Sequence, residues 1–125
     1  MSKIMVVDDE QDLREMVCLF IETEGYEVVD AKNGKECIEK LKDGCAPDLI
    51  LLDIMMPEMN GLETIKKINE DPSWKNIPVV FLTAHMDSIA KTEERLLAKD
   101  YIKKPFELEY LKQKIDNILK IHKSF

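Results

Sequence analysis

The sequence contains a short apolar run, Leu49–Leu52, that ends abruptly on the carboxylate of Asp53. A strand that is apolar on both faces is typical of the middle of a parallel sheet covered by helices. Pro57 and the pair Asn60-Gly61 then mark a connecting loop. We therefore expect Asp53 at the carboxyl end of a buried strand, at the mouth of a loop. An isolated aspartate there is most simply a residue that caps a turn, so its role depends on the rest of the chain.

Strand-sized apolar segments alternate along the chain with segments of helical periodicity. We expect strands at residues 4–7, 26–31, 49–53, 78–83 and 100–103. Strands that alternate with helices predict a parallel sheet with right-handed crossovers and helices on both faces. The expected fold is therefore α/β, a three-layer (βα)5 sandwich of the flavodoxin-like type with strand order 2-1-3-4-5. One domain should span residues 1–125, with no output domain after the fifth helix.

The five expected helices differ in how clearly the sequence defines them. The first ends at Gly25 and has an inner apolar face formed by Leu13, Met16, Val17, Phe20 and Ile21. Capping boxes open the second helix, at Asn33 and Glu36, and the third, at Asn60 and Glu63. The fourth, near residues 87–98, is highly charged and has a thin apolar stripe. The last is expected to begin at Pro105, with inward residues Leu108, Leu111, Ile115, Ile118 and Ile121 or His122.

The composition limits the functions that the chain can have. Its 125 residues are enough for one hydrophobic core without disulfides or metals. Three cysteines, an odd number with no CxxC pair, favour a reducing compartment, and we expect a cytoplasmic protein. There is no signal-peptide pattern and no apolar run long enough to span a membrane. The net charge of -7 argues against direct binding to nucleic acid or to an anionic membrane.

Five polar residues follow or end the predicted strands. Asp8 and Asp9 follow the first strand, Asp53 ends the third, Thr83 ends the fourth, and Lys104 follows the fifth. Because the carboxyl ends of parallel strands lie at one edge of a sheet, we expect these side chains to meet at one rim, beside the crevice between strands one and three. Taken singly, each has an ordinary structural explanation, such as a helix cap or a solvated lysine.

Three carboxylates at one rim repel one another. A pair of charges about 4 Å apart costs on the order of 4 kcal/mol at an effective dielectric of 20. Protonation or a divalent cation would offset this repulsion. Hard oxygen ligands without His or Cys favour Mg²⁺, or Mn²⁺, over zinc. A carboxylate, a metal site, a hydroxyl and an ammonium are together the parts needed for phosphoryl transfer to an aspartate.

Four segments closely resemble, in order and spacing, the receiver domain of two-component response regulators. They are VVDDE (6–10), LILLDIMMPEMNG (49–61), VVFLTA (79–84) and DYIKKPF (100–106), and the resemblance covers almost the whole chain. It implies that Asp53 accepts a phosphoryl group from a sensor histidine kinase or a histidine phosphotransfer protein. It further implies that Mg²⁺ is bound by Asp53, by Asp9, by Asp8 directly or through water, and by the backbone carbonyl of Met55.

The same resemblance implies a phosphorylation-activated signalling switch rather than an enzyme acting on a separate substrate. Lys104 would bind a phosphoryl oxygen, Thr83 would move to bond the acyl phosphate, and Tyr101 would turn inward with it, although Tyr101 could equally be a half-buried strand residue. The output would be a changed face on the fourth helix, fifth strand and fifth helix, recognised by an unidentified downstream protein. We expect a monomer or a phosphorylation-dependent dimer. The chain is either stand-alone, like the chemotaxis regulators, or part of a larger regulator.

Three features qualify the resemblance. Receiver domains usually carry a Gly-Ala pair before the fifth strand, where this chain has Leu97-Ala98 and then Lys99, so the geometry of that turn stays open. Met55 and His85 stand two residues after the acceptor and the threonine, positions that flank the path of hydrolytic water in such domains. Met55 offers water no strong hydrogen bond, so we expect slow self-dephosphorylation. His85 could orient water or contact a partner, and both could also be ordinary loop residues.

Three other functions fit parts of the pattern. A degenerate receiver would bind a partner without being phosphorylated. An aspartyl-phosphate hydrolase of the haloacid-dehalogenase type would carry a second aspartate two residues after the first, where this chain has Met55. A flavodoxin-like electron carrier would hold its cofactor phosphate in a loop rich in Ser, Thr and Gly after the first strand. Here that loop is Asp8-Asp9-Glu10, which would repel a phosphate.

Overall fold

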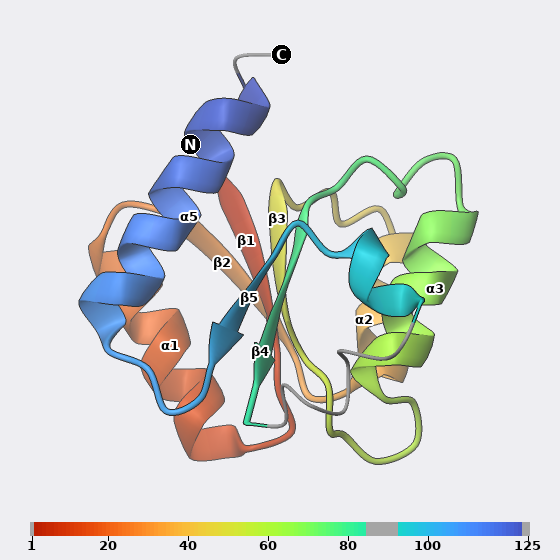
Figure 1. Ribbon diagram of the computed structural model, residues 1–125, viewed down its shortest axis with the longest axis horizontal. Helices are drawn as coiled ribbons and strands as arrows, with labels where there is room; N and C mark the ends of the chain where they lie inside the picture. Colours follow the sequence, from red (N-terminus) through yellow and green to blue (C-terminus); the bar gives the residue numbers. More distant parts are fainter. Residues whose placement is uncertain (1, 85–92, 124–125) are drawn as a thin grey trace.

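A computed structural model of the chain describes residues 2–84 and 93–123 (Figure 1). Its strands are β1 (Lys3–Val7), β2 (Glu27–Ala31), β3 (Leu49–Asp53), β4 (Val79–Thr83) and β5 (Asp100–Lys103). Its helices are α1 (Gln11–Thr23), α2 (Gly34–Lys42), α3 (Gly61–Glu70), the 3₁₀ helix η1 (Glu94–Leu97) and α5 (Leu108–Lys123). Neighbouring strands are all parallel and their order is β2-β1-β3-β4-β5. The predicted sheet is therefore confirmed.

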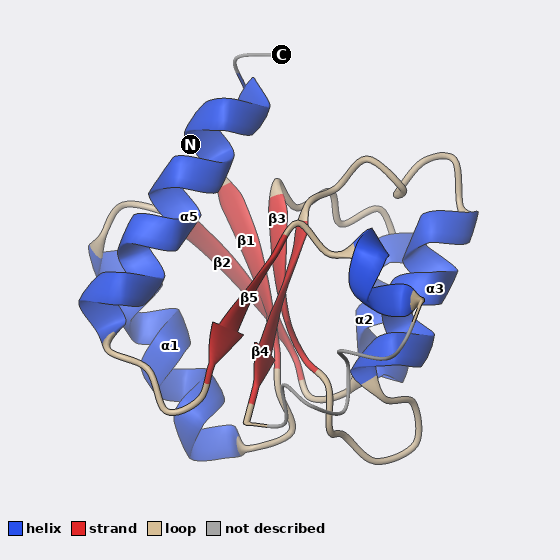
Figure 2. Ribbon diagram, viewed as in Figure 1, coloured by secondary structure: helices blue, strands red, loops and turns tan. Residues whose placement is uncertain are grey.

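The sheet is the middle layer of three. Figure 2 shows α1 and α5 on one face of the sheet and α2, α3 and η1 on the other. Side chains alternate along each strand, so Met5 and Val7 of β1 pack in the core under α2 and α3, whereas Ile4 and Val6 pack under α1 and α5. All residues of β3 and β4 are buried. Because both faces of the sheet are covered, the central strands can be apolar at successive positions.

One of the two predicted capping boxes is complete, and the other is half formed. Asn60 and Glu63 form a complete box at the start of α3, in which each side chain accepts a hydrogen bond from the other residue's backbone N–H. At the start of α2 the Asn33 side chain accepts from the N–H of Glu36 at 2.8 Å. The Glu36 carboxylate, however, accepts from the N–H of Lys32. The predicted box at α2 is therefore only half formed, because Glu36 reaches one residue beyond the N-cap.

Two predictions about helices α1 and α5 are wrong in detail. Met16 is 47% exposed rather than inside. The buried stripe of α1 contains Val17, and Met16 lies about 100° around the helix from it. The last helix begins at Leu108 rather than at Pro105. The N–H of Lys104 donates to the carbonyl of Thr83 at 2.8 Å, so the chain still follows the edge of β4 at that point and turns into the helix later.

The fourth predicted helix lies partly outside the described residues, at 87–92. Its described end, Glu94–Leu97, is a single turn of 3₁₀ helix rather than α-helix, and the N–H of Leu96 donates to the carbonyl of Glu93. Ala98 then adopts an extended conformation, with φ of -82° and ψ of 145°. Leu97, which stands at the position of the missing glycine, ends η1 without a positive φ, so the turn needs no left-handed residue there. The inward placement predicted for Ile121 or His122 concerns side chains outside the described part.

None of the helices in the described part of the chain is both long enough and apolar enough to cross a bilayer.

Candidate functional site

The strand register brings the predicted polar residues together at one edge of the sheet. Val7 pairs with Leu52, so Asp8 and Asp53 follow at the same level on adjacent strands. Thr83, at the end of β4, pairs with Lys103, and Lys104 is the next residue. The strand arrows of Figure 1 point to this edge. The sheet topology therefore brings the five residues to one edge, as expected.

Asp8 makes hydrogen bonds through its backbone N–H and through both carboxylate oxygens. Its N–H donates to the carbonyl of Ala31 at 3.1 Å, which ties the end of β1 to the end of β2. One carboxylate oxygen accepts from the N–H of Glu10 at 2.9 Å. The other accepts from Nζ of Lys104 at 2.8 Å. The side chain is buried, so this charge depends on these partners rather than on water.

Asp8, Asp9 and Asp53 form an acidic cluster. Each offers a carboxylate oxygen, and these oxygens all lie within 4.8 Å of one another. Asp8 and Asp53 are buried, whereas Asp9 is exposed. The cluster therefore opens to solvent on the Asp9 side, which leaves a path for a small ligand to reach the buried carboxylates.

The environment of Asp53 raises the pKa of its carboxyl group. Burial raises its pKa, the negative charge of Asp8 raises it further, and Lys104 lowers it, which leaves a pKa of about 7. Lys104 lies 3.5 Å from the Asp53 carboxylate as well as bonding Asp8. Burial alone would lower the pKa of Lys104, but Asp8 and Asp53 outweigh it and hold that pKa above its ordinary value. One ammonium thus faces two buried carboxylates and leaves the cluster with excess negative charge.

The donor set fits a hard divalent cation. Mg²⁺ binds oxygen ligands at about 2.1 Å, so two ligands on opposite sides of the ion lie about 4.2 Å apart. The spacing of the three carboxylate oxygens, within 4.8 Å, allows them to approach one ion. The cluster contains no thiolate or imidazole, the ligands that zinc prefers. Asp8, Asp9 and Asp53 are therefore a fitting set for Mg²⁺.

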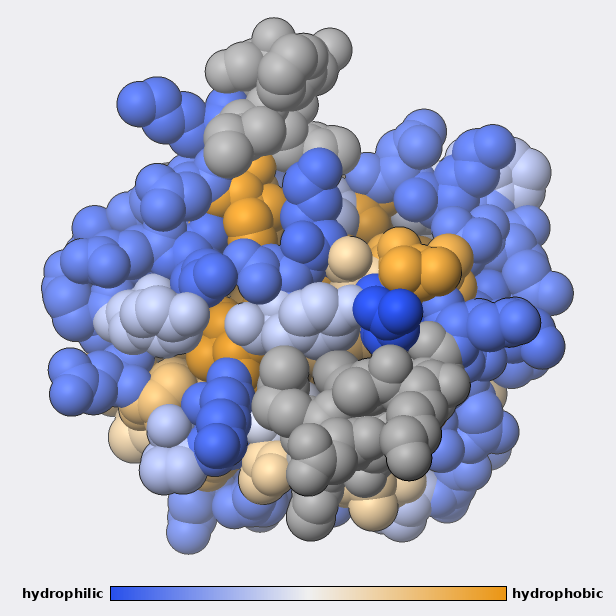
Figure 3. All heavy atoms as spheres, viewed as in Figure 1, coloured by the Kyte–Doolittle hydropathy of each residue, from blue (hydrophilic) through white to orange (hydrophobic). Residues whose placement is uncertain are grey.

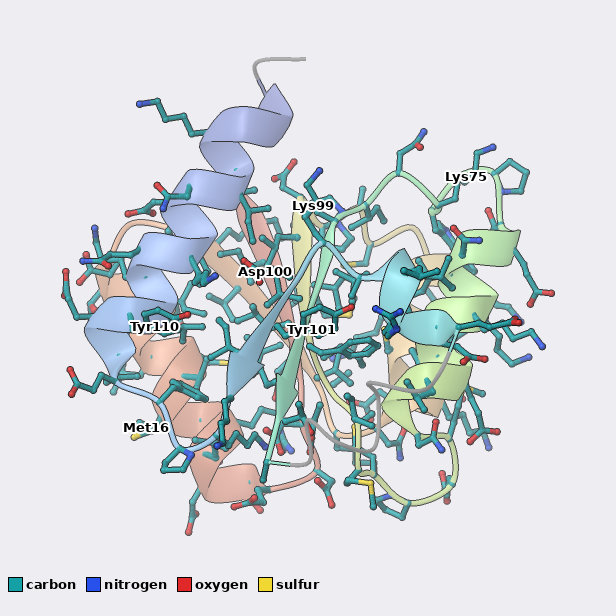
Figure 4. All side chains as sticks on the ribbon, viewed as in Figure 1. Met16, Lys75, Lys99, Asp100, Tyr101 and Tyr110 are labelled. Carbon is teal, nitrogen blue, oxygen red and sulfur yellow. The ribbon has the colours of Figure 1, made fainter. Side chains whose placement is uncertain are left out.

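The two predicted switch residues stand on neighbouring strands. Thr83 is buried at the end of β4. Tyr101 of β5 stacks on Phe81, with ring centroids 6.1 Å apart, and its hydroxyl donates to the backbone carbonyl of Arg95 in η1. Figure 4 shows the Tyr101 side chain reaching from β5 toward η1. Tyr101 therefore links the sheet to η1 rather than pointing at the acidic cluster.

The two predicted rate-tuning residues differ in whether the structure describes them. Met55, in the loop after β3, is 55% exposed, so its side chain does not belong to the core. His85 lies outside the described residues.

Arg14 is a residue near the site that sequence reasoning missed. Its Nη1 donates to the backbone carbonyl of Asp8 at 2.7 Å, and its Nε donates to the Asp30 carboxylate at 2.9 Å. In the sequence it is one charged residue in a helix, which normally points into solvent. Only the packing of α1 against the ends of β1 and β2 reveals its position.

A second missed feature is the close approach of Gly61 to the candidate acceptor. A Cβ atom on Gly61 would lie 2.4 Å from the backbone carbonyl oxygen of Asp53 and 2.7 Å from Cα of Ile54. The N–H of Gly61 donates to the carbonyl of Ile54 at 2.8 Å. The start of α3 is therefore packed directly on the backbone at the end of β3.

An apolar cavity of about 370 Å³ adjoins the acidic cluster. Leu13 and Met16 of α1 form one side, and Pro105 and Phe106 of the loop before α5 form the other. Lys104 contributes to the lining, so the cavity connects the exposed apolar surface with the charged site. This arrangement gives the partly exposed side chain of Met16 a defined place beside the site.

Comparison with known proteins gives a consistent assignment. The sequence profile of the response regulator receiver domain matches residues 4–116. The transcriptional regulatory protein CpxR homolog of Haemophilus influenzae is 40% identical over 121 residues, and the response regulator SaeR of Staphylococcus aureus is 38% identical over 126 residues. These alignments cover 96% and 95% of this chain but 51% of either relative. The chain thus spans about half the length of these curated relatives.

Solved structures agree with the sequence comparison. The response regulator TrrA of Thermotoga maritima, solved in complex with Mg²⁺-BeF, superposes with a TM-score of 0.84 at 35% identity and covers 94% of this chain and 98% of that one. A CheY-like receiver domain protein of Methanospirillum hungatei superposes with a TM-score of 0.88 at 34% identity, covering 99% and 98%. The fold, the acidic edge and these similarities lead to one conclusion. The chain belongs to the family of response regulator receiver domains.

Proposed function

We propose that residues 1–125 form a single receiver domain whose Asp53 accepts a phosphoryl group, and that this switches the η1–β5–α5 face for a partner. The observation that carries the proposal is the position of Asp53, which is 5% exposed at the end of β3 with Asp8, Asp9 and Lys104 around it. A cation near the buried carboxylate favours its ionised form, and phosphoryl transfer needs cations around the transferred group. The same arrangement meets both needs.

The phosphoryl donor is a phosphohistidine of a sensor histidine kinase or of a histidine phosphotransfer protein. An Asp53 carboxylate oxygen attacks phosphorus, the phosphorus–nitrogen bond breaks, and the histidine ring keeps the electron pair and takes up a proton. Asp8, Asp9, Asp53 and the Met55 carbonyl would hold Mg²⁺, or Mn²⁺, which neutralises charge on the phosphoryl oxygens. The chain catalyses its own phosphorylation and dephosphorylation and acts on no separate substrate.

Lys104 and Thr83 bind the oxygens of the transferred phosphoryl group. Lys104 already lies 3.5 Å from the Asp53 carboxylate, so its ammonium can bind a phosphoryl oxygen without a large movement. Thr83 ends the neighbouring strand β4, and its hydroxyl moves to donate to the acyl phosphate. Tyr101 lies one strand further on and gives up its hydrogen bond to Arg95 as Thr83 moves. The change at Asp53 is thereby passed to η1.

The apolar cavity beside Lys104 is the surface that the phosphodonor protein contacts. Its walls, from α1 and the loop before α5, lie next to the acidic edge, so a helix carrying the phosphohistidine could rest there and still reach Asp53. Met16 is the exposed apolar residue on this wall, and Figure 4 shows it beside the start of α5. Burial of such side chains supplies binding energy at protein interfaces.

The output surface comprises η1, β5 and α5. Leu96 of η1 is 73% exposed, and Figure 3 shows a hydrophobic patch over η1. Beside it Lys114 pairs with Asp100 at 2.7 Å and lies over the ring of Tyr110 at 5.6 Å. An exposed apolar residue next to charged pairs is the composition of a protein-binding surface. A downstream protein binds this face. Measuring the molecular size of the protein with and without phosphorylation tests whether a second copy of the chain binds there instead.

Intact mass tests the proposal directly. The protein is incubated with Mg²⁺ and a small acyl phosphodonor, and one added phosphoryl group is expected. Asp53→Asn and a chelated sample should gain nothing, whereas Asp43→Asn, an exposed matched control at the end of α2, should gain the group normally. Absence of a gain, together with no beryllofluoride adduct by NMR, would contradict phosphorylation. It would support the degenerate receiver that binds its partner constitutively.

A further inference from the structure

Arg14 joins two strand ends to a helix beside the acidic cluster. It projects from α1, donates through Nη1 to the carbonyl of Asp8 at 2.7 Å, and donates through Nε to the carboxylate of Asp30 at 2.9 Å. Its side chain is only 13% exposed. A planar guanidinium that bonds two groups in different directions has little freedom, so Arg14 acts as a rigid bracket.

The carbonyl that Arg14 holds belongs to the peptide that joins Asp8 to Asp9. A peptide unit is planar, so a fixed carbonyl also fixes the N–H and Cα of the following residue. Asp9 supplies the exposed carboxylate of the cluster and has to point toward Asp8 and Asp53. The direction of the Asp9 side chain therefore depends on the orientation of this peptide.

Asp30 anchors the bracket from the opposite side. It lies on β2, the edge strand next to β1, and its backbone carbonyl accepts a hydrogen bond from Nζ of Lys40 in α2. Lys40 also approaches the Asp30 carboxylate at 4.0 Å. The hydrogen bonds from Arg14 to Asp30 and to the Asp8 peptide thus connect α1, β1 and β2. Of these three residues, Asp8 alone belongs to the acidic cluster.

We propose that Arg14 is a positioning residue that orients the Asp8–Asp9 peptide so that the acidic cluster can bind Mg²⁺. The inference rests on the proposed function, because it takes Asp8, Asp9 and Asp53 as the metal ligands. The hydrogen bonds of Arg14 go to the Asp8 backbone and to Asp30, not to the carboxylates of this cluster. Its contribution is the geometry of the backbone that carries two ligands.

The sign of the effect separates positioning from simple electrostatics. Arg14 is a cation near a site for another cation, so if it acted only through its charge, removal would tighten Mg²⁺ binding. If it positions the peptide, removal weakens binding. Outer-shell partners of metal ligands change affinity by about tenfold to a hundredfold when they are removed. We expect a loss of about tenfold, because Asp8 keeps its bonds to Glu10 and Lys104.

Three variants dissect the bracket. Arg14→Gln removes both the charge and the planar guanidinium. Arg14→Lys keeps the charge, but its ammonium cannot donate to Asp8 and Asp30 with the geometry of a guanidinium. Asp30→Asn leaves Arg14 in place and weakens its anchor. Lys66→Gln on the exposed side of α3 is the matched control for loss of one positive charge. The double variant of Arg14→Gln and Asp30→Asn shows whether the two residues act through one path.

Mg²⁺ affinity is measured by titration, followed through the backbone amide resonances of Asp8, Asp9 and Asp53. We expect Arg14→Gln and Arg14→Lys to bind Mg²⁺ about tenfold more weakly, Asp30→Asn to show a smaller loss, and the double variant to resemble Arg14→Gln. Lys66→Gln should match the parent chain. Equal or tighter binding by the Arg14 variants would overturn the inference, as would a parent chain that binds no Mg²⁺. If Arg14→Gln does not fold, Asp30→Asn decides, and unchanged affinity in that variant overturns the inference.

The acyl-phosphodonor assay is run on the same samples. A parent chain that gains a phosphoryl group, beside Arg14 variants with normal Mg²⁺ affinity, would remove the inference and leave the proposed function intact. A parent chain that gains none would contradict the proposed function, whereas the Mg²⁺ titration would still decide the role of Arg14.

Discussion

Lys104 and Asp8 are 96 positions apart in the sequence, yet Nζ of Lys104 lies 2.8 Å from the Asp8 carboxylate. The same ammonium lies 3.5 Å from Asp53. The positive charge that partly offsets the buried acidic edge therefore comes from a distant part of the chain. Its arrival requires β5 to pair with β4, which couples assembly of the site to completion of the sheet.

Replacing Lys104 should lower the free energy of unfolding. In Lys104→Ala, two buried carboxylates lose their common cation, and breaking a buried ion pair costs about 3 kcal/mol or more. Urea denaturation should show this loss, and added Mg²⁺ should restore more stability to the variant than to the parent chain. The neighbouring Lys103→Ala, at an exposed position, should change the free energy of unfolding by less than about 0.5 kcal/mol. Similar losses in both variants would contradict a buried role for Lys104.

Gly61→Ala should affect the proposed acceptor, Asp53, as well as the stability of the fold. The new Cβ would lie 2.4 Å from the Asp53 carbonyl, and the neighbouring atoms are backbone that cannot rotate away. We expect the free energy of unfolding to fall by about 2 kcal/mol and phosphorylation by an acyl phosphodonor to slow. Gly25→Ala is the control, because Gly25 has φ of +95° and open space around it. That variant should lose about 1 kcal/mol of stability through backbone strain and be phosphorylated at the normal rate.

Glu58→Gly should stabilise the protein. Glu58 has a positive φ of 67°, which a residue with a Cβ adopts at a cost of about 1–2 kcal/mol. Glycine removes that cost but loses more backbone entropy on folding, so the expected net gain is about 0.5 kcal/mol. The substitution also removes the hydrogen bond from Nδ2 of Asn33 to the Glu58 carboxylate, which at 3.4 Å is long and weak. Glu58→Ala keeps the strain and lacks this hydrogen bond, so denaturation curves should place it slightly below the parent chain.

The bond from the Tyr26 hydroxyl to Asp116 should make stability pH dependent. Burial by itself raises the pKa of Asp116, but hydrogen bonds from Tyr26 and Lys112 outweigh it and lower that pKa. A lowered pKa in the folded state means that the stabilisation is present above the unfolded pKa and is lost as the pH falls through the folded one. The Asp116 side chain is 40% exposed, so Tyr26→Phe should cost only about 1 kcal/mol at pH 7.

Denaturation at a series of pH values checks this prediction. The difference between the parent chain and Tyr26→Phe should be constant near neutrality and should shrink below about pH 4, where the carboxylate becomes protonated. An equal difference at pH 3 and pH 7 would show that the Tyr26 hydroxyl does not act through the charge of Asp116.

Met55→Asn should shorten the lifetime of the phosphorylated protein. The Met55 side chain stands exposed in the loop after Asp53 and offers water no strong hydrogen bond, whereas an amide can hold an attacking water. The mass of the phosphorylated form is followed after the phosphodonor is removed. Leu19→Asn, at an exposed apolar residue of α1 that does not line the cavity beside Lys104, should decay at the parent rate. An equal or slower decay of Met55→Asn would contradict a shielding role for Met55.

The sequence predicted the main parts of the site because each part is tied to a strand end. Asp8, Asp53 and Lys104 follow apolar runs that are strand-sized, and parallel pairing brings all strand ends to one edge. Predictions that depended on the exact face of a helix were less successful. Met16 fits a helical stripe, but the stripe is narrower than the pattern suggests, and Met16 lines a cavity instead. The start of α5 was missed because the local pattern after Pro105 does not reveal that Lys104 still bonds Thr83.

The alternation of strands and helices, the parallel sheet, and the polar residues at its carboxyl edge can all be derived from the amino-acid sequence. Local hydrophobic periodicity and turn chemistry decide these features, and both are written in consecutive residues. Three contacts cannot be derived in this way: Arg14 bonds the Asp8 carbonyl, Gly61 packs on the Asp53 backbone, and Tyr101 bonds Arg95. These contacts join separate elements, so they depend on how helices pack on the sheet, which local periodicity does not specify.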